Sequence, residues 1–214
     1  MQKSDSTLDD RAARPRGRGR PRGFDRGRAL AQAMRLFWAK GYEATSIADL
    51  TEAMGIGAPS LYAAFGAKDA LYAEALRYYE ATYEHLVWGR FRTAPTARDA
   101  VTAYLLDSAA VLTGGPDDHP LGCMVTLSAV GSEGHAELGE MVRKARAVTL
   151  QRLEACLSAA VATGELPAST DVHGQARLIQ AIQAGMSILA RDGASRDELE
   201  AVARRAVAGW GAGF

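Results

Sequence analysis

The side chains that point most clearly to a binding chemistry are arginines near the N-terminus. Arg18, Arg20 and Arg22 alternate with Gly and Pro in a polar stretch. A guanidinium group binds phosphate oxygens bidentately, and the negative potential of a narrow minor groove attracts it. Extended Gly and Pro let such a backbone lie in a groove. Two interpretations stay open: a segment that binds the minor groove of DNA, or a non-specific electrostatic tail.

Catalysis and metal binding find little support in the sequence. It contains no Gly-rich phosphate loop, no metal-spaced His/Cys cluster and no G-x-S-x-G motif, which are common signatures of such sites. His119 and Cys123 stand at i, i+4, where they could share a metal or a redox event. The alternative is an incidental loop histidine and a buried thiol. We therefore expect no enzyme activity, no cofactor and no metal.

Composition favours a cytoplasmic protein with a sizeable core. Hydrophobic residues make up 48% of the 214 residues, enough to bury a core. The two cysteines are too few for a disulfide framework, which favours a reducing compartment. The sequence has no run of about 18 apolar residues and no apolar signal region at its start. We expect neither a membrane span nor secretion.

The charge is unevenly distributed along the chain. Lys plus Arg and Asp plus Glu are 25 each, for a net charge of zero. Residues 1–65 hold 11 basic and 7 acidic side chains, whereas residues 66–214 hold 14 and 18. The first part therefore carries +4 and the second −4, which indicates a basic part that meets a polyanion.

Helical periodicity predicts an all-α protein. Residues 1–23 are polar and rich in Pro, Gly and Arg, so we expect a disordered arm. From residue 24 onward apolar residues recur at helical spacing, and no strand alternation is evident. The expected helices span 24–40, 46–54, 58–65, 68–91, 98–112, 121–130, 133–163, 171–191 and 196–210.

Two short helices joined by a glycine-containing turn predict a helix-turn-helix at about residues 46–65. Gly55-Ile-Gly57 makes the turn, and Pro59 stands near the first turn of the second helix. Helices this short need a shared core. We expect a DNA-binding domain over residues 24–67 and a larger helical sensing and dimerisation domain over 68–214. The expected core of the first domain is Leu30, Phe37, Ile47, Leu50, Met54, Ile56, Leu61 and Phe65.

Three runs in this region resemble the TetR/AcrR family of bacterial transcriptional regulators. They are FWAKGYEATSI at 37–47, AMGIGAPSLYAAF at 53–65 and KDAL at 68–71. The resemblance is specific over about residues 24–80. Beyond them only the helical layout and the Gly122-Cys123 start of a helix look like the family.

The resemblance implies roles for individual residues. Thr45 matches a position whose hydroxyl caps a helix and contacts phosphate. Tyr62 matches a tyrosine that touches the DNA backbone, and Lys68 a lysine that reaches phosphate. Residues 57–60, which include Ala58, Pro59 and Ser60, and residues 63–64 match variable base-reading positions. At these base-reading positions the sequence departs from many family members, and few polar side chains remain to read bases.

The last two long helices are the expected dimer interface. Apolar and small residues follow helical spacing along both, and the family pattern implies a four-helix bundle across a two-fold axis. The alternative is that both helices belong to the core of one protomer. The expected interface residues are Leu178, Ile182, Gly185, Leu189, Leu199, Val202, Ala206 and Trp210.

Aromatic and methionine side chains of the middle helices suggest a cavity for a small-molecule effector. Such cavities are mostly apolar with few polar groups. Each of these residues could equally be ordinary core. The expected lining residues are Tyr83, Trp88, Tyr104, Met124 and Met141.

Together these observations predict a homodimeric regulator that binds a palindromic operator in double-stranded DNA. We expect a repressor that a small molecule releases, with no membrane partner. The alternative is an architectural, nucleoid-type protein that has no ligand and binds mainly through its arginine arm. The effector and the operator sequence are not readable from these residues.

Overall fold

The computed structural model describes residues 24–115, 119–132 and 134–210, and their regular elements are all α-helices. This confirms the all-α prediction. The arginine arm, with Arg18, Arg20 and Arg22, lies outside the described residues. None of the helices in the described part is long and apolar enough to cross a membrane.

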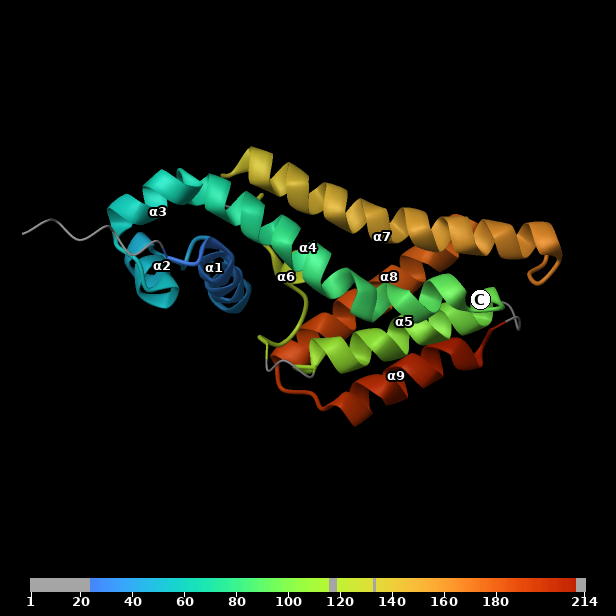
Figure 1. Ribbon diagram of the computed structural model, residues 1–214. Helices are drawn as coiled ribbons and strands as arrows, with labels where there is room; N and C mark the ends of the chain where they lie inside the picture. The colour runs from blue at the N-terminus through green and yellow to red at the C-terminus, as the bar shows by residue number, and fades with distance from the viewer. Residues whose placement is uncertain (1–23, 116–118, 133, 211–214) are drawn as a thin grey trace, which may run out of the picture.

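The first three helices of the described chain gather at one end of the molecule (Figure 1). They are α1 (Arg26–Lys40), α2 (Ile47–Met54) and α3 (Ala58–Phe65). Local signals delimit them. Ser46 and Asp49 form a capping box at the start of α2, and Gly55 ends the helix in the left-handed conformation with φ 66°.

The larger part is built from the remaining helices. Helix α4 runs from the three-helix end across the molecule, beside α7, to the other end, where α5, α8 and α9 gather (Figure 1). Its helices are α4 (Lys68–Thr93), α5 (Ala97–Leu112), α6 (Met124–Leu127), α7 (Ala136–Thr163), α8 (Val172–Arg191) and α9 (Arg196–Ala208).

Helix α6 is much shorter than the predicted 121–130. Gly122 has φ +77°, and a Cβ there would lie 2.8 Å from the backbone oxygen of Ser187, so the chain cannot enter a helix at this point. At the other end Ser128 is extended, and its hydroxyl lies 2.9 Å from the Tyr72 hydroxyl. Contacts with distant helices therefore limit α6 to one turn.

Two hydrophobic clusters form the core, and α4 contributes to both. The first joins α1–α3 to the N-terminal half of α4 and to the start of α7, where Leu138 and Val142 are buried. The second joins the end of α4, at Trp88, to α5, α7, α8 and α9. Cys123 packs against both clusters. The two parts of the molecule therefore share one long helix and a common packed seam.

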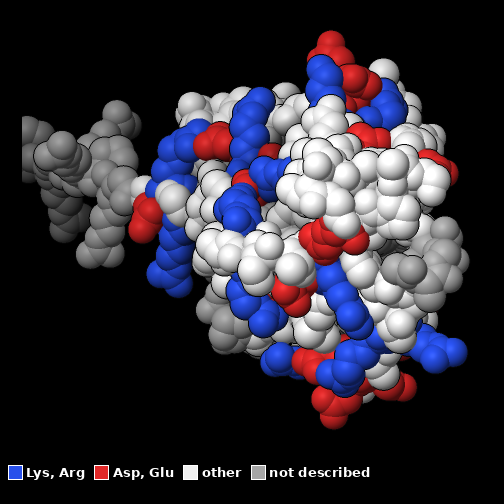
Figure 2. All heavy atoms as spheres, turned by 90° about the vertical axis from the view of Figure 1, so that its right-hand side faces the viewer, with Lys and Arg blue, Asp and Glu red and all other residues white. Residues whose placement is uncertain are grey.

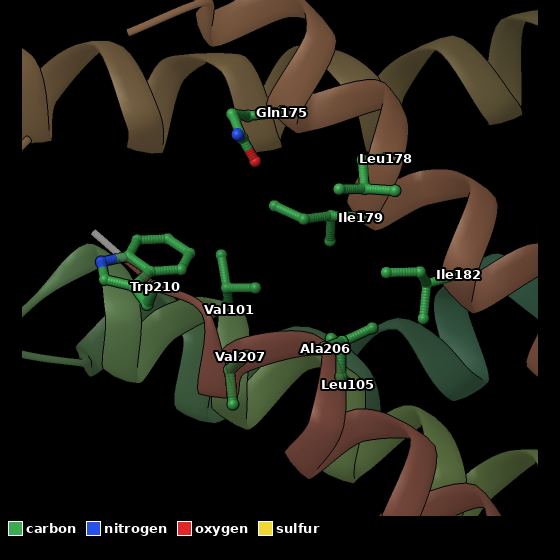
Figure 3. Close-up of a pocket in the computed structure, with 9 residues that line it drawn as sticks. All are labelled: Val101, Leu105, Gln175, Leu178, Ile179, Ile182, Ala206, Val207 and Trp210. Atoms are coloured by element: carbon green, nitrogen blue, oxygen red, sulfur yellow. The ribbon is translucent and has the colours of Figure 1, made fainter. Parts of the chain in front are cut away.

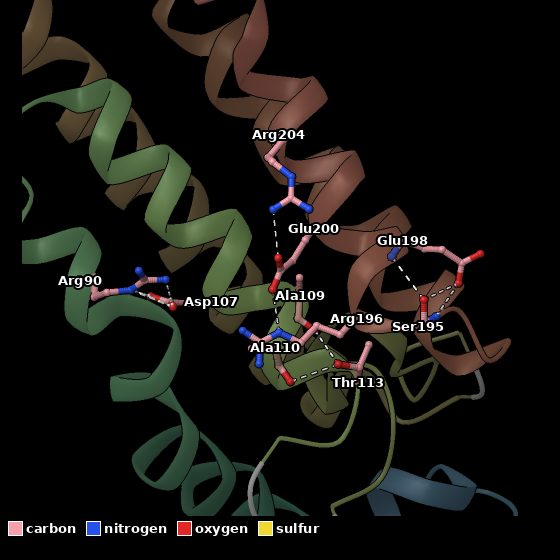
Figure 4. A network of polar contacts seen from close by, with 10 residues as sticks. All are labelled: Arg90, Asp107, Ala109, Ala110, Thr113, Ser195, Arg196, Glu198, Glu200 and Arg204. Atoms are coloured by element: carbon pink, nitrogen blue, oxygen red, sulfur yellow. Dashed lines mark hydrogen bonds and ion pairs between the residues drawn. The ribbon is translucent and has the colours of Figure 1, made fainter.

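Figure 4 shows polar contacts on α4, α5 and α9. The guanidinium of Arg90 donates from Nε to both carboxylate oxygens of Asp107 at 3.0 and 2.9 Å, which ties α4 to α5. Ser195 and Glu198 form a capping box at the start of α9. The end of the molecule farthest from α1–α3 shows basic and acidic side chains interspersed (Figure 2). Such exposed pairs contribute little stability individually.

Candidate DNA interface and effector cavity

The N-terminal half of α3 presents its side chains outward. Pro59 and Ser60 are exposed, Ala58 is half-buried, and the Tyr62 side chain is 51% exposed. Leu61, between them, is fully buried in the first hydrophobic cluster. One face of α3 is thus anchored while the opposite face is free, which is how a recognition helix is offered to a major groove.

The helix-capping role predicted for Thr45 is wrong. Its side chain is fully buried, and its hydroxyl donates a 2.6 Å hydrogen bond to the carbonyl oxygen of Gly41. The cap of α2 is Ser46, whose hydroxyl accepts from the backbone N–H of Asp49 at 3.0 Å. Thr45 therefore closes the turn after α1, and the expected capping role passes to its neighbour.

Lys68 begins α4 beside a polar cluster that orients it. Its ammonium lies 4.1 Å from the ring centroid of Tyr42, a cation–π contact. The Tyr42 hydroxyl donates to the Asp69 carboxylate. Burial, followed by this hydrogen bond, raises the pKa of Tyr42, so its ring stays neutral. His135, at the start of α7, pairs with Glu43 at 2.7 Å.

Lys68→Gln should lower the salt dependence of operator binding. Removing one phosphate contact lowers the slope of log K against log salt by about 0.9 and weakens binding to every sequence alike. The slope is measured by fluorescence anisotropy across a salt series. Lys144→Gln, an exposed lysine on α7, is the matched control and should leave the slope unchanged. An unchanged slope for Lys68→Gln would remove this residue from the interface.

A cavity of about 810 Å³ lies between α4, α5, α6, α7 and α8. Three of the predicted residues, Tyr83, Trp88 and Tyr104, line it, and the Trp88 and Tyr104 ring centroids are 4.5 Å apart. Burial raises the pKa of Tyr104, so this wall is neutral. The full lining is Tyr79, Glu80, Tyr83, Glu84, Val87, Trp88, Tyr104, Cys123, Val125, Thr126, Ala145, Arg146, Val148, Thr149, Arg152, Arg177, Gln180, Ala181, Gln183 and Ala184.

Met124 and Met141 do not line this cavity. Met124 is 3% exposed and packs in the first hydrophobic cluster, and Met141 packs against that cluster. The one-turn helix α6 places Met124 on its α1–α4 side, whereas its neighbours Cys123 and Val125 reach the cavity. Polar residues of α7 and α8 were missed. Their only sequence signal is spacing, such as Arg177 and Gln180 at i, i+3 on an otherwise apolar helix.

The segment around α6 connects the cavity to α1. Cys123 accepts a hydrogen bond from the Tyr79 hydroxyl at 3.3 Å, and its N–H donates to the Ser187 hydroxyl at 2.8 Å. The Arg191 guanidinium, at the end of α8, donates to the carbonyl oxygens of Trp38, Ala39 and Leu121 at 3.0–3.1 Å. Hydrogen bonds thus run from the segment that contains Cys123, at the cavity wall, to the end of α1.

His119 is built into the core. Its ring is 4% exposed, stacks 4.6 Å from the Trp38 ring centroid and lies edge-on to Tyr83. Among residues 24–115, 119–132 and 134–210, no group of three His, Cys, Asp or Glu side chains could hold a metal ion. This packing is that of a core histidine.

Helices α8 and α9 carry an exposed apolar face. Leu178 and Leu189 are 40% and 45% exposed, and Val202 is 37% exposed. Ile188, which was not predicted, is 53% exposed. Of the other predicted residues, Gly185 is partly buried, and Ile182, Ala206 and Trp210 line a recess of about 10 Å³ between α5, α8 and α9 (Figure 3), far too small for a ligand.

Leu199 was wrongly placed in the interface. It is fully buried in the second hydrophobic cluster, within the protomer. On α9 the inward positions are Leu199, Ala203 and Val207, about one helical turn apart, and Val202 lies at the exposed edge of this stripe. The alternative that α8 and α9 belong to the protomer core therefore holds for one side of each helix, since α8 also buries Ile179 and Met186 in this cluster.

A recognition helix on a three-helix base, joined through α4 to a helical part with a cavity, defines a DNA-binding helix-turn-helix regulator. The chain belongs to the TetR family of bacterial regulatory proteins, whose N-terminal profile matches residues 29–75. It is 36% identical over 197 residues to the HTH-type transcriptional repressor ComR of Escherichia coli K12, covering 91% of this chain and 93% of that repressor.

Solved structures agree with this assignment. A cysteine mutant of the TetR family transcriptional regulator CifR, complexed with 26-base-pair operator DNA, matches with a TM-score of 0.83 and 37% identity. The match covers 90% of this chain and 100% of that one. A TetR regulator from Chloroflexus aurantiacus matches at a TM-score of 0.75 and 24% identity, over 86% and 92% of the two chains, which shows a common fold.

Proposed function

We propose that this protein is a homodimeric repressor that binds a palindromic operator and releases it when a small molecule fills the cavity. One observation carries this proposal: the exposed face of α3 and the cavity are joined by a single helix, α4. Lys68 stands at the first end of α4, and Tyr83 and Trp88 line the cavity near the other.

Release follows from a difference in affinity between two conformations. The effector must bind better to the conformation in which the two recognition helices are wrongly spaced for successive major grooves, about 34–36 Å apart. Two tethers transmit the change: α4 itself, and the Arg191 contacts that hold the end of α1 to α8. α4 is a continuous packed helix and the Arg191 contacts are direct hydrogen bonds, so a small shift at the cavity moves α1–α3 as a unit.

The relatives support this reading. ComR, which matches along nearly its whole length, is named a transcriptional repressor, and CifR was solved on its operator. We infer a cytoplasmic location, where a bacterial operator is accessible, and no enzymatic activity. The exposed face of α8 and α9, which includes Ile188 and Leu189, supports the homodimer.

An arm deletion separates this function from the architectural alternative. Removing residues 1–22 should leave a preference of roughly 10³-fold or more for the operator over random DNA, because α3 carries the specificity. The measurement is a gel shift with the palindrome upstream of the gene and a scrambled duplex, at moderate salt.

Two results would contradict the proposal. Equal affinity of the intact protein for both duplexes would exclude a specific regulator. Loss of nearly all binding on arm deletion, together with a steep salt slope, would favour the architectural protein, in which arginines contact phosphates regardless of sequence. Deleting residues 211–214 at the other end is the matched truncation and should change neither affinity.

A further inference from the structure

The cavity has two chemically different walls. Tyr83 and Trp88 of α4 and Tyr104 of α5 form an aromatic wall, and their side chains are 4%, 7% and 2% exposed. The other wall comes from α7 and α8. It carries Arg146 and Arg177, and also Arg152 of α7, which lies over the Trp88 ring; its remaining side chains are neutral. A ligand that fits both walls must be amphipathic.

The charges next to the aromatic wall are compensated. The Arg152 guanidinium donates to Glu84 at 2.9 Å and lies 5.0 Å from the Trp88 ring centroid. Glu84 also pairs with Arg92. Burial, and then the neighbouring Glu84, raises the pKa of Glu80, which disfavours its charged form. This side of the cavity therefore carries no excess negative charge to attract a cation.

Arg146 and Arg177 have no carboxylate partner in the described part of the chain. Arg146 donates to the carbonyl oxygens of Val125, Thr126 and Ser128 at 2.7–3.0 Å. Arg177 donates to the Gln180 side chain at 3.1 Å. Carbonyl and amide oxygens satisfy the N–H groups without cancelling the positive charge. In a partly desolvated cavity such an excess favours an anion.

Gln180 connects the two helices that carry Arg146 and Arg177. Its amide donates to the backbone oxygen of Arg146 at 2.9 Å, while its oxygen accepts from Arg177. The backbone of Arg146 on α7 and the side chain of Arg177 on α8 are thereby joined through one amide. A cationic ligand is disfavoured, because Arg152 already covers the Trp88 ring where a cation would stack.

We propose that the cavity binds a small organic anion, with its acidic group against Arg146 and Arg177 and its apolar body against Trp88 and Tyr104. This inference rests on the proposed function, since it names the class of effector for the same cavity. A volume of about 810 Å³ accommodates a carboxylate or sulfonate on an aromatic or medium-length aliphatic body.

Two fluorescent probes with one skeleton test the charge requirement. Anilinonaphthalene sulfonate carries an anionic group, and N-phenylnaphthylamine is the same body without it. Arg177→Gln should weaken binding of the sulfonate by about tenfold, and Arg146→Gln by a similar factor, the cost of losing one charge-assisted hydrogen bond. Binding of the neutral probe should change by less than about twofold. Both titrations use the full chain without DNA.

The controls keep the test decisive. Arg98→Gln removes an exposed arginine that does not line the cavity and should affect neither probe. Ala184→Trp fills the cavity and should abolish binding of both. Arg177 bonds only Gln180 among the described side chains, so its variant carries the test if Arg146→Gln destabilises the protein, as thermal unfolding followed by circular dichroism would show.

Three outcomes would overturn the anion site. These are equal losses for both probes in the arginine variants, an unchanged sulfonate affinity, or sulfonate binding that survives Ala184→Trp. Failure of the repressor function looks different. There, the sulfonate binds in an arginine-dependent way, yet a saturating concentration leaves operator affinity unchanged in anisotropy measurements.

Discussion

Replacing Ile188 and Leu189 with Glu is expected to convert the dimer to monomers and to weaken operator binding by at least about 100-fold. Both side chains are large, apolar and roughly half exposed, at 53% and 45%. In a dimer they would be buried against the partner, and a carboxylate buried there without a counter-charge costs several kcal/mol.

The loss of DNA affinity follows from the geometry of the operator. A dimer contacts two half-sites with one association event, whereas a monomer contacts one. Specific affinities of roughly 10⁻⁸–10⁻¹¹ M depend on both half-sites, so a single half-site falls toward the non-specific range. Sedimentation analysis measures the oligomeric state, and a gel shift on the palindrome measures the affinity.

The control for this variant is Ala159→Glu, which adds a carboxylate at an exposed position of α7 and should leave both measurements unchanged. Circular dichroism should show that the double variant keeps its helices, because neither residue belongs to the buried core. A dimer that persists in the double variant would move the interface away from this face of α8.

Phe37→Ala is expected to destabilise the protein by about 3–5 kcal/mol, the usual cost of removing a buried phenylalanine side chain. Phe37 is 2% exposed, and its ring lies 6.1 Å from the Tyr42 ring and 5.1 Å from the Tyr72 ring. Small domains are stable by only about 5–15 kcal/mol in total. A loss of this size leaves α1–α3 poorly held.

Operator binding should fall with stability, because Tyr42 and Tyr72 join α1 to α4 and thereby position Lys68. Urea unfolding followed by circular dichroism measures the free energy of unfolding, and a gel shift measures DNA binding. Phe37→Leu keeps most of the apolar contact and should recover most of both. A change in unfolding free energy of less than about 1 kcal/mol for Phe37→Ala would show that this packing is not the anchor of α1–α3.

The three-helix base was predictable because its signals are local. Asp25 and Ser46 are capping residues whose hydrogen bonds lie within three positions of themselves. Gly55 adopts the left-handed conformation that ends α2. The buried residues Leu50 and Leu61 follow directly from helical spacing in short elements.

The cavity was less predictable because it depends on contacts between distant segments. The length of α6 is limited by Gly122 packing on Ser187, sixty-five positions away, and this decides that Met124 turns toward α1 and Cys123 toward the cavity. The charge of the far wall likewise depends on which arginines find a carboxylate in space. Spacing along one helix carries no information on either.

The amino-acid sequence by itself determined the all-α class, the position of the helix-turn-helix and the arginine-rich start of a chain whose total charge is zero. These depend on periodicity, capping and composition, which act over a few residues. The tertiary structure alone decided which side of α8 and α9 faces the protomer core. The apolar residues of α9 form one stripe on an otherwise polar helix, and packing against α5 and α8 buries Leu199 whereas Val202, at the edge of the stripe, stays 37% exposed.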